Sequence, residues 1–183
     1  CLSLHNSPFI SGLYLSISDW GFHLWSKTRT DTALFVSTRA KVRLTGGCWS
    51  PNRPGIILLS RFDGSIEIWD LTYSSSDPKV SLAAIPVTIS SMEFIGSEHE
   101  SNLLAVGDTE GSLFLFELPL DLTKIFPNEK DQMLDFINRE ARKLLRTESK
   151  VNQKENAIQN KPVIQSCYTD DEIKETFDMF EKK

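Results

Sequence analysis

Short apolar runs separated by tight turns occupy the first 118 residues, and three segments share one layout. Each segment has an apolar run, then an acidic residue followed by glycine or tryptophan, and then a second run with alternating side chains. These segments cover residues 13–25, 56–70 and 103–117. Turns such as Asp-Gly supply a positive φ at little cost between two pleated strands. The pattern therefore predicts three β-hairpins.

The three hairpins recur at a nearly constant interval. Their closing aromatic residues, Trp25, Trp69 and Phe116, are separated by 44 and 47 residues. Ahead of the hairpins lie segments that can form a further strand, for example residues 91–94. A period of about 40–45 residues with four short strands per repeat is typical of β-propeller blades. The sequence thus predicts an all-β region of about three blades over residues 1–125.

The pattern changes after Pro119. Apolar residues then recur every three or four positions, which predicts an amphipathic helix over residues 126–148. Residues 149–168 are rich in Lys, Asn and Gln with little periodicity, so we expect a flexible linker there. Residues 169–183 begin with capping-box spacing and are predicted to form a short acidic amphipathic helix. The β region is therefore expected to carry an α-helical C-terminal tail.

Composition and charge exclude several classes of function. The 183-residue chain has a net charge of −5, which argues against nucleic-acid binding because that function usually needs a basic surface. No apolar run approaches the roughly 20 residues that span a bilayer, so a membrane protein is not expected. Three scattered cysteines favour a reducing compartment. Because the chain opens at Cys1 rather than Met, we expect further blades upstream and an exposed blade edge at the N-terminal side.

The second repeat resembles a known type of blade. Trp69-Asp70 is the dipeptide that ends the third strand of a blade in WD-repeat propellers. Degenerate copies occupy residues 22–26 and 113–117. The fold class implied by this resemblance is a partial WD40 β-propeller, about three blades of a longer one.

The resemblance narrows to one family. Residues 48–55 read Cys-Trp-Ser-Pro-Asn-Arg-Pro-Gly and lead into the hairpin that turns at Asp63-Gly64. A Trp-Ser-Pro-x-Arg-Pro segment ahead of an Asp-Gly hairpin resembles the last blades of dynein intermediate chains. The similarity covers about residues 5–125. The exit from the last blade at residues 117–119 looks most like that of the axonemal inner-arm intermediate chains.

This resemblance implies a non-catalytic intermediate-chain subunit of an axonemal inner-arm dynein. In that family the propeller grips the tail of a dynein heavy chain and supports assembly and attachment of the motor for ciliary motility, while ATP hydrolysis belongs to the heavy chain. The implied partners are the heavy chain, other intermediate and light chains, and axonemal microtubule or docking proteins. The implied location is the cytoplasm and cytoskeleton, in the axoneme of a cilium or flagellum. No cofactor is expected.

Two alternatives remain open from the sequence. A generic WD-repeat adaptor of another assembly, such as intraflagellar transport, shares the same blades. An enzyme built on a propeller would need polar catalytic groups on the inner strands, whereas the segments 47–49 and 92–94 are largely apolar. The sequence also lacks a catalytic constellation, a cysteine–histidine metal motif and a phosphate-binding glycine loop.

Six residues are candidates for contacts with a partner protein. Arg53 and Arg61 flank the second hairpin, where an arginine is either a solvated loop charge or a contact to an acidic surface. Trp49 suits either blade packing or a contact on the top face. In the C-terminal helix an apolar stripe at i, i+4 and i+7 either packs on this protein's own propeller or binds a partner. That stripe consists of Ile173, Phe177 and Phe180.

Overall fold

The computed structural model describes residues 1–96, 102–124 and 126–159, with side chains described as far as residue 150. Within these ranges the chain forms eleven strands and two helices. The strands are β1 (Ser3–Asn6), β2 (Leu13–Ser18), β3 (Gly21–Ser26), β4 (Phe35–Val36), β5 (Leu44–Trp49), β6 (Ile56–Arg61), β7 (Ser65–Asp70), β8 (Val80–Ala83), β9 (Ile89–Ile95), β10 (Leu103–Asp108) and β11 (Leu113–Glu117). The helices are α1 (Leu120–Thr123) and α2 (Glu129–Gln159).

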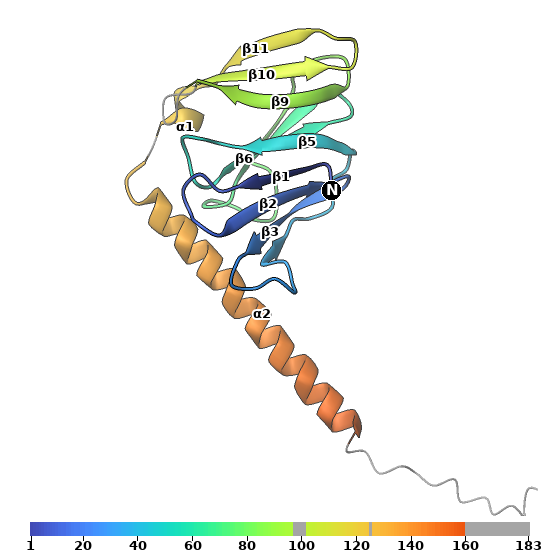
Figure 1. The fold of residues 1–183 in the computed structure, drawn as a ribbon, viewed down its shortest axis with the longest axis vertical. Coiled ribbons are helices and arrows are strands. Elements are labelled where there is room, and N and C mark those ends of the chain that lie inside the picture. Colours follow the sequence, from blue (N-terminus) through green and yellow to red (C-terminus); the bar gives the residue numbers. More distant parts are fainter. Residues whose placement is uncertain (97–101, 125, 160–183) are drawn as a thin grey trace, which may run out of the picture. The chain divides into compact units, whose positions relative to one another are not determined.

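The strands form three antiparallel sheets that follow one another along the chain (Figure 1). The first sheet has the order β1-β2-β3-β4, the second β5-β6-β7-β8 and the third β9-β10-β11. Each sheet is a meander, because every strand pairs with its neighbour in sequence. The predicted fold, about three blades followed by a helical tail, is confirmed.

The three predicted hairpins are β2–β3, β6–β7 and β10–β11. In the second hairpin Leu58 lies opposite Ile68. Its turn depends on Gly64, which has a φ of 78°. A Cβ atom at this position would collide with the carbonyl oxygen of Ile85. The turn therefore requires glycine for both its conformation and its close packing.

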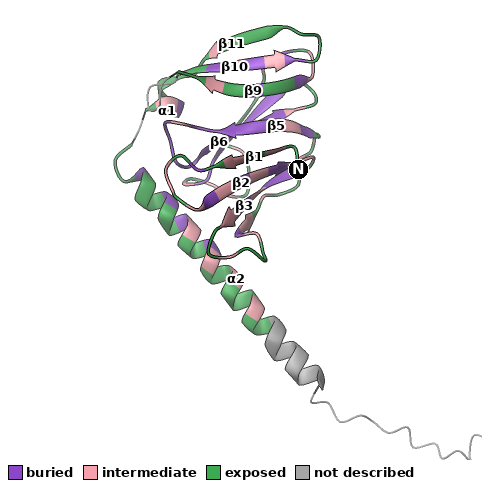
Figure 2. Cartoon of the chain, in the orientation of Figure 1, coloured by how far each residue is buried: buried purple, intermediate pink, exposed green. Residues whose placement is uncertain are grey.

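The second sheet is buried on both faces (Figure 2). All six residues of β7 and the first five of β6 are buried. In β2, by contrast, buried and half-buried residues alternate, because only one face of the first sheet is covered. A strand buried on both faces has a continuous apolar sequence rather than an alternating one. This explains the run Ile56-Ile57-Leu58-Leu59.

Two hydrophobic cores lie on the two sides of the second sheet. In the first core, Phe22 of the first sheet packs edge-on against Trp69 of the second, with ring centroids 5.1 Å apart. In the second core, Leu58 and Ile68 pack with Leu104 of the third sheet. Neighbouring positions of β6 therefore serve opposite cores, Ile57 the first and Leu58 the second.

The outward faces of the two end sheets expose apolar side chains. On the third sheet Leu113 and Leu115 are 69% and 59% exposed. On the first sheet Leu4 and Val36 are 67% and 58% exposed. Within the described residues the third sheet has three strands and ends at β11. Both end sheets of the described region therefore present apolar side chains on their outward faces, and the blade edge expected at the N-terminal side stays a prediction.

Helix α2 runs further than the sequence pattern indicated. It begins at Glu129 and continues to Gln159, past the predicted end at residue 148 and into the predicted linker. No glycine or proline lies between residues 149 and 159, and Lys, Gln, Glu and Ala there are good helix formers. The rest of the predicted linker, 160–168, and the predicted helix at 169–183 lie outside the described residues.

The chain divides into two compact units, residues 1–144 and 145–183. In the first unit, α2 contributes Met133 and Phe136 to the first core. Phe136 meets Phe35 of β4 edge-on, with ring centroids 5.5 Å apart.

Among the described residues, no helix combines the length and the apolar character needed to cross a membrane.

The covered second sheet generates a stability prediction. Ile57 is fully buried, so Ile57→Ala in the full-length protein should lower the free energy of unfolding by about 2–5 kcal/mol. Val36→Ala, at an exposed position, should change it by less than about 0.5 kcal/mol. Denaturant titration measures both values. Equal losses for the two variants would contradict the sandwiched position of the second sheet.

Candidate protein-binding site

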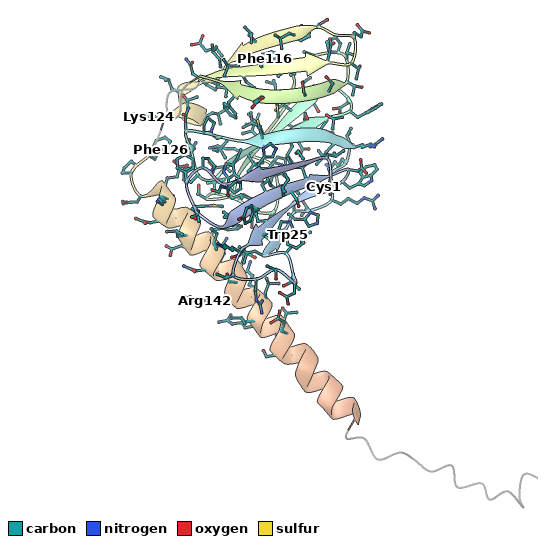
Figure 3. All side chains as sticks on the ribbon, in the orientation of Figure 1. Cys1, Trp25, Phe116, Lys124, Phe126 and Arg142 are labelled. Atoms are coloured by element: carbon teal, nitrogen blue, oxygen red, sulfur yellow. The ribbon has the colours of Figure 1, made fainter. Side chains whose placement is uncertain are left out.

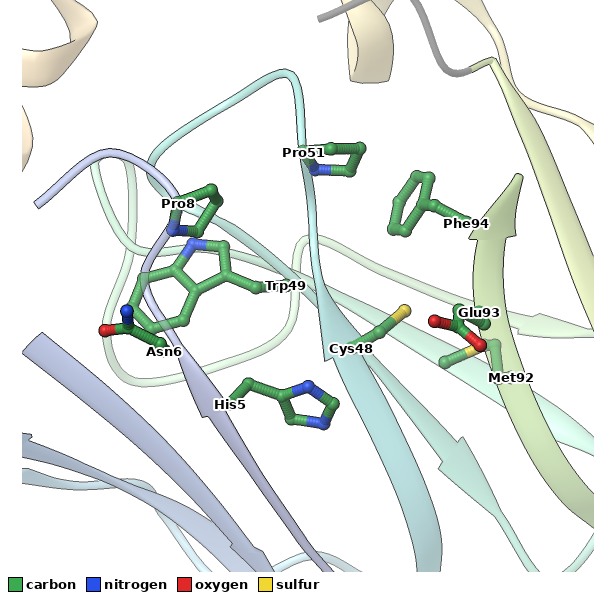
Figure 4. Close-up of a pocket in the computed structure, with 9 residues that line it drawn as sticks. All are labelled: His5, Asn6, Pro8, Cys48, Trp49, Pro51, Met92, Glu93 and Phe94. Atoms are coloured by element: carbon green, nitrogen blue, oxygen red, sulfur yellow. The ribbon is translucent and has the colours of Figure 1, made fainter. Parts of the chain in front are cut away.

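The inner strands of the three sheets line a pocket of about 440 Å³ (Figure 4). His5 and Asn6 come from β1, Cys48 and Trp49 from β5, and Glu93 from β9. Each of these strands, β1, β5 and β9, is the first strand of its meander, and the three sheets face the pocket through these first strands. The pocket combines apolar walls with a few polar groups.

Cys48 is the most shielded polar group in this pocket. Burial raises the pKa of its thiol, and the negative charge of Glu93 raises it further. The thiol therefore stays protonated at neutral pH and is a poor nucleophile or metal ligand. The described residues contain no group of three or more His, Cys, Asp or Glu side chains that could hold a metal ion.

Trp49 lines this pocket and also packs in the first core. Only 6% of the residue is exposed. Its indole Nε1 donates a hydrogen bond to the carbonyl oxygen of Pro54, at 2.9 Å. Of the two interpretations of Trp49, this geometry favours blade packing.

The segment after β5 forms a tight turn that directs Arg53 inward. The Ser50 hydroxyl oxygen accepts hydrogen bonds from the backbone N–H groups of Asn52 and Arg53, at 3.3 and 3.2 Å. Ser50 is 1% exposed, so these local bonds satisfy a buried hydroxyl. The Trp-Ser-Pro-x-Arg-Pro motif thus has a structural explanation: Trp49 enters the core, Ser50 closes the turn and Arg53 points into the protein.

Arg53 is the centre of a buried group that we name the Arg53 node: the side chains of Arg53, Asp70 and Glu129 and the backbone carbonyl group of Asp121. The Arg53 side chain is 5% exposed, and its Nη2 lies 2.6 Å from Glu129 Oε1 and 3.5 Å from Asp70 Oδ2. Its Nε also donates to Glu129 Oε1, at 2.7 Å, and its Nη1 donates to the Asp121 carbonyl oxygen, at 2.6 Å. The node joins the second sheet to α1 and to the first turn of α2.

Phe126 lies in the link between the two helices (Figure 3). The guanidinium carbon of Arg53 lies 5.0 Å from the centre of the Phe126 ring. A cation over an aromatic face is attracted by the ring's quadrupole. Phe126 thus covers the ion pairs from one side.

Asp70, the acidic residue of the Trp-Asp dipeptide, is held ionised. Burial works to raise its pKa, but hydrogen bonds from Thr72 and Lys79 and the charges of Lys79 and Arg53 outweigh burial. The pKa of Asp70 therefore lies below its ordinary value of 3.8. Its Oδ2 is 3.0 Å from Lys79 Nζ, and its Oδ1 accepts a hydrogen bond from the Thr72 hydroxyl at 2.6 Å.

The structure separates the two candidate arginines. Arg53 satisfies its charge within the chain, so the acidic groups that it contacts are Asp70 and Glu129 rather than groups of a partner. Arg61 also pairs locally, with Glu67 at 3.2 Å and Asp63 at 3.4 Å, but it lies at the wall of a surface cleft. The candidate stripe of Ile173, Phe177 and Phe180 lies outside the described residues and stays a prediction.

Sequence reasoning missed Glu129 and Asp121 as parts of the site. Glu129 lies 76 positions from Arg53 in the chain, and no local pattern links them. One signal was available: Glu129 opens a helix, where a carboxylate is favoured by the helix dipole and can accept a partner's charge. The Arg53 node is thus a tertiary feature with only a weak local signature.

The Arg53 node generates a second stability prediction. Arg53→Met in the full-length protein leaves buried Glu129 without its counter-charge and removes one of the two cations beside Asp70, so it should cost about 3–5 kcal/mol of unfolding free energy. Arg43→Met is the matched control, because Arg43 pairs with Asp19 at 2.9 Å on the surface, where the cost should stay below about 1 kcal/mol. Thermal unfolding measures the difference. A loss no greater than that of the control would show that the node does not hold α2.

The lowered pKa of Asp70 generates a pH prediction. A carboxylate with a depressed pKa in the folded state adds stability above its unfolded value, and this contribution is lost as pH falls through the folded value. The wild-type protein should therefore lose stability below about pH 4, and Asp70→Asn should flatten this part of the curve. Unfolding midpoints between about pH 5 and pH 2.5 measure both slopes. Parallel curves for the two proteins would refute the assignment.

Comparisons with known proteins agree with this geometry. Residues 2–118 match the family model described as the dynein axonemal intermediate chain 3 WD40 domain. A sea urchin (Heliocidaris crassispina) protein named "Dynein intermediate chain 3, ciliary" is 30% identical over 141 residues, which are 77% of this chain and 23% of the relative. The Chlamydomonas reinhardtii protein "Dynein, 70 kDa intermediate chain, flagellar outer arm" is 29% identical over 138 residues, 75% of this chain and 24% of the relative.

Human "Dynein axonemal intermediate chain 3" is 28% identical over 142 residues, 78% of this chain and 16% of the relative. The chain thus spans a quarter or less of the length of these relatives. The matched family region includes all three sheets and the Trp-Ser-Pro-x-Arg-Pro segment that forms the Arg53 node. The chain belongs to the dynein axonemal intermediate chain family, within its WD40 domain.

Proposed function

We propose that the protein containing this chain is a non-catalytic intermediate-chain subunit of an axonemal dynein, whose propeller binds the tail of a heavy chain. The observation that carries the proposal is the match of residues 2–118 to an axonemal dynein intermediate chain WD40 domain. The names of two relatives, one ciliary and one flagellar, support a location in the axoneme. Other intermediate chains and light chains are the further proposed partners.

The architecture suits a scaffold. Stacked sheets with well-packed cores hold their connecting loops in fixed positions, and such loops are where binding residues concentrate. The Arg53 node and Phe136 fix the first half of α2 against the sheets. In this role the chain positions a motor whose ATP hydrolysis takes place in the heavy chain.

The protein could belong to either the inner or the outer dynein arm. The resemblance of the exit from the last blade, residues 117–119, supports the inner arm. The Chlamydomonas relative is named for the outer arm, which supports the alternative. We propose the inner arm, and identification of the bound heavy chain decides between the two.

Immunoprecipitation of the endogenous full-length protein tests the proposal. An antibody against residues 150–168, used on extracts of ciliated cells, should recover dynein heavy and light chains in near-equal amounts by quantitative mass spectrometry. The same antibody blocked with its own peptide is the control. Recovery of intraflagellar transport proteins without dynein chains would replace the proposal with the general adaptor.

The predicted C-terminal stripe supplies a variant for the same assay. Phe177→Ala with Phe180→Ala should reduce recovery of dynein chains while leaving the unfolding midpoint of the protein unchanged. Phe62→Ala with Tyr73→Ala is the matched control, because these aromatic residues are 57% and 84% exposed in the turns that follow β6 and β7. Unchanged recovery in the stripe variant, or loss of soluble protein, would remove the stripe from the proposed partner contacts.

A further inference from the structure

A cleft of about 360 Å³ lies beside the second sheet, on the side of the first sheet. One wall is the link from β4 to β5, residues 38–41, and the opposite wall includes Arg61 and Glu67. Strand β4 has two residues whereas β8 has four, so the outer edge of the first sheet is short. The Thr38 hydroxyl donates a hydrogen bond to the carbonyl oxygen of Ser76 at 2.9 Å, which fixes the link.

Positive charge exceeds negative charge in this cleft. Arg39, Lys41 and Arg61 line it together with two acids, Glu67 and Asp77. We call the site formed by these five residues the basic cleft. The excess is local, since the chain as a whole carries a net charge of −5.

Arg61 forms the fixed part of the cleft. Its side chain is 12% exposed and is held by Glu67 at 3.2 Å and by the Ser81 hydroxyl oxygen at 3.1 Å. Its buried Nε–H has no acceptor among the described residues. Arg61 also lies 3.4 Å from Asp63, and as a lining residue it adds a fixed positive charge to the cleft.

Arg39 and Lys41 form the exposed rim of the cleft. Both side chains are exposed, and neither has an ion-pair partner within the part of the chain that the structure describes. Arg39 stacks over the Trp20 ring, with its guanidinium carbon 4.9 Å from the ring centre, and this contact leaves its donors accessible. By comparison, nearby Arg43 is already paired with Asp19 at 2.9 Å.

We propose that the basic cleft binds an acidic segment of a partner protein, which places a carboxylate between Arg39, Lys41 and Arg61. Glu67 and Asp77 keep the excess of positive charge small, which suits a single carboxylate better than the continuous row of phosphates of a nucleic acid. The volume is near the lower limit for binding pockets and accommodates a few side chains. The inference goes beyond the proposed function, because it concerns the chemistry of this surface in whichever complex the protein joins.

A defined probe tests the proposal directly. A fluorescein-labelled ten-residue peptide of alternating Glu and Ser is titrated with the full-length protein at low salt, and fluorescence anisotropy reports binding. We expect saturable binding that weakens as salt increases. Arg39→Glu with Lys41→Glu should weaken it about tenfold, because the change replaces two attractive charges of the cleft with two repulsive ones.

Two control variants distinguish binding at the cleft from a general effect of the protein's charge. Lys27→Glu with Arg43→Glu makes the same charge change at exposed positions outside the cleft and should leave the affinity within about twofold of wild type. Asp77→Asn removes an acid from the cleft and should strengthen binding about twofold. This second change has the opposite sign, so damage to the fold cannot imitate it.

Three outcomes would overturn the proposal. The first is absence of binding to the Glu-Ser peptide at low salt. The second is an equal loss of affinity in the cleft variant and in the Lys27/Arg43 control. The third is tighter binding of a single-stranded ten-nucleotide DNA than of the peptide, lost in the same cleft variant, which would assign the cleft to nucleic acid instead.

Discussion

The structure depends on covering both faces of its second sheet. An apolar run such as Ile56–Leu59 is stable in a strand only if neighbouring elements remove both of its faces from water. The first sheet with α2 covers one face, and the third sheet with α1 covers the other. This burial fixes the register of β6 against β7 and, with it, the position of the turn at Gly64. If one strand slipped by one residue, its side chains for the first core would point into the second core and the reverse.

A second, smaller constraint concerns charge. Arg53 and Asp70 are 4% and 3% exposed, so each needs opposite charge and hydrogen bonds close by. Glu129 supplies part of that compensation from a distant part of the sequence. The buried charge of Arg53 beside the second sheet therefore holds the first residue of α2 in place. The Trp-Ser-Pro-x-Arg-Pro motif, which begins at Trp49, thus positions a helix as well as forming a turn.

Elements governed by local pattern were predictable, and those governed by tertiary contact were not. The hairpins followed from alternation and from turns such as Asp63-Gly64, because both signals lie within a few residues. The end of α2 could not be predicted in this way. The segment after residue 148 has the polar composition of a linker, but its residues are good helix formers, and the helix continues to Gln159. The role of Arg53 also escaped prediction: a loop arginine looks the same in sequence whether its acidic partner belongs to the same chain or to another.

The path of α2 has a mechanical consequence. The helix follows the third sheet in the chain, is bound at Glu129 to the second sheet through Arg53, and packs through Phe136 on Phe35 of the first. One helix is thus fastened to both the first and the second sheet. A change in the angle between these two sheets would strain the Arg53–Glu129 ion pair or the contact between Phe35 and Phe136. Force applied to the first sheet is therefore transmitted to the second through α2 rather than absorbed between the two sheets.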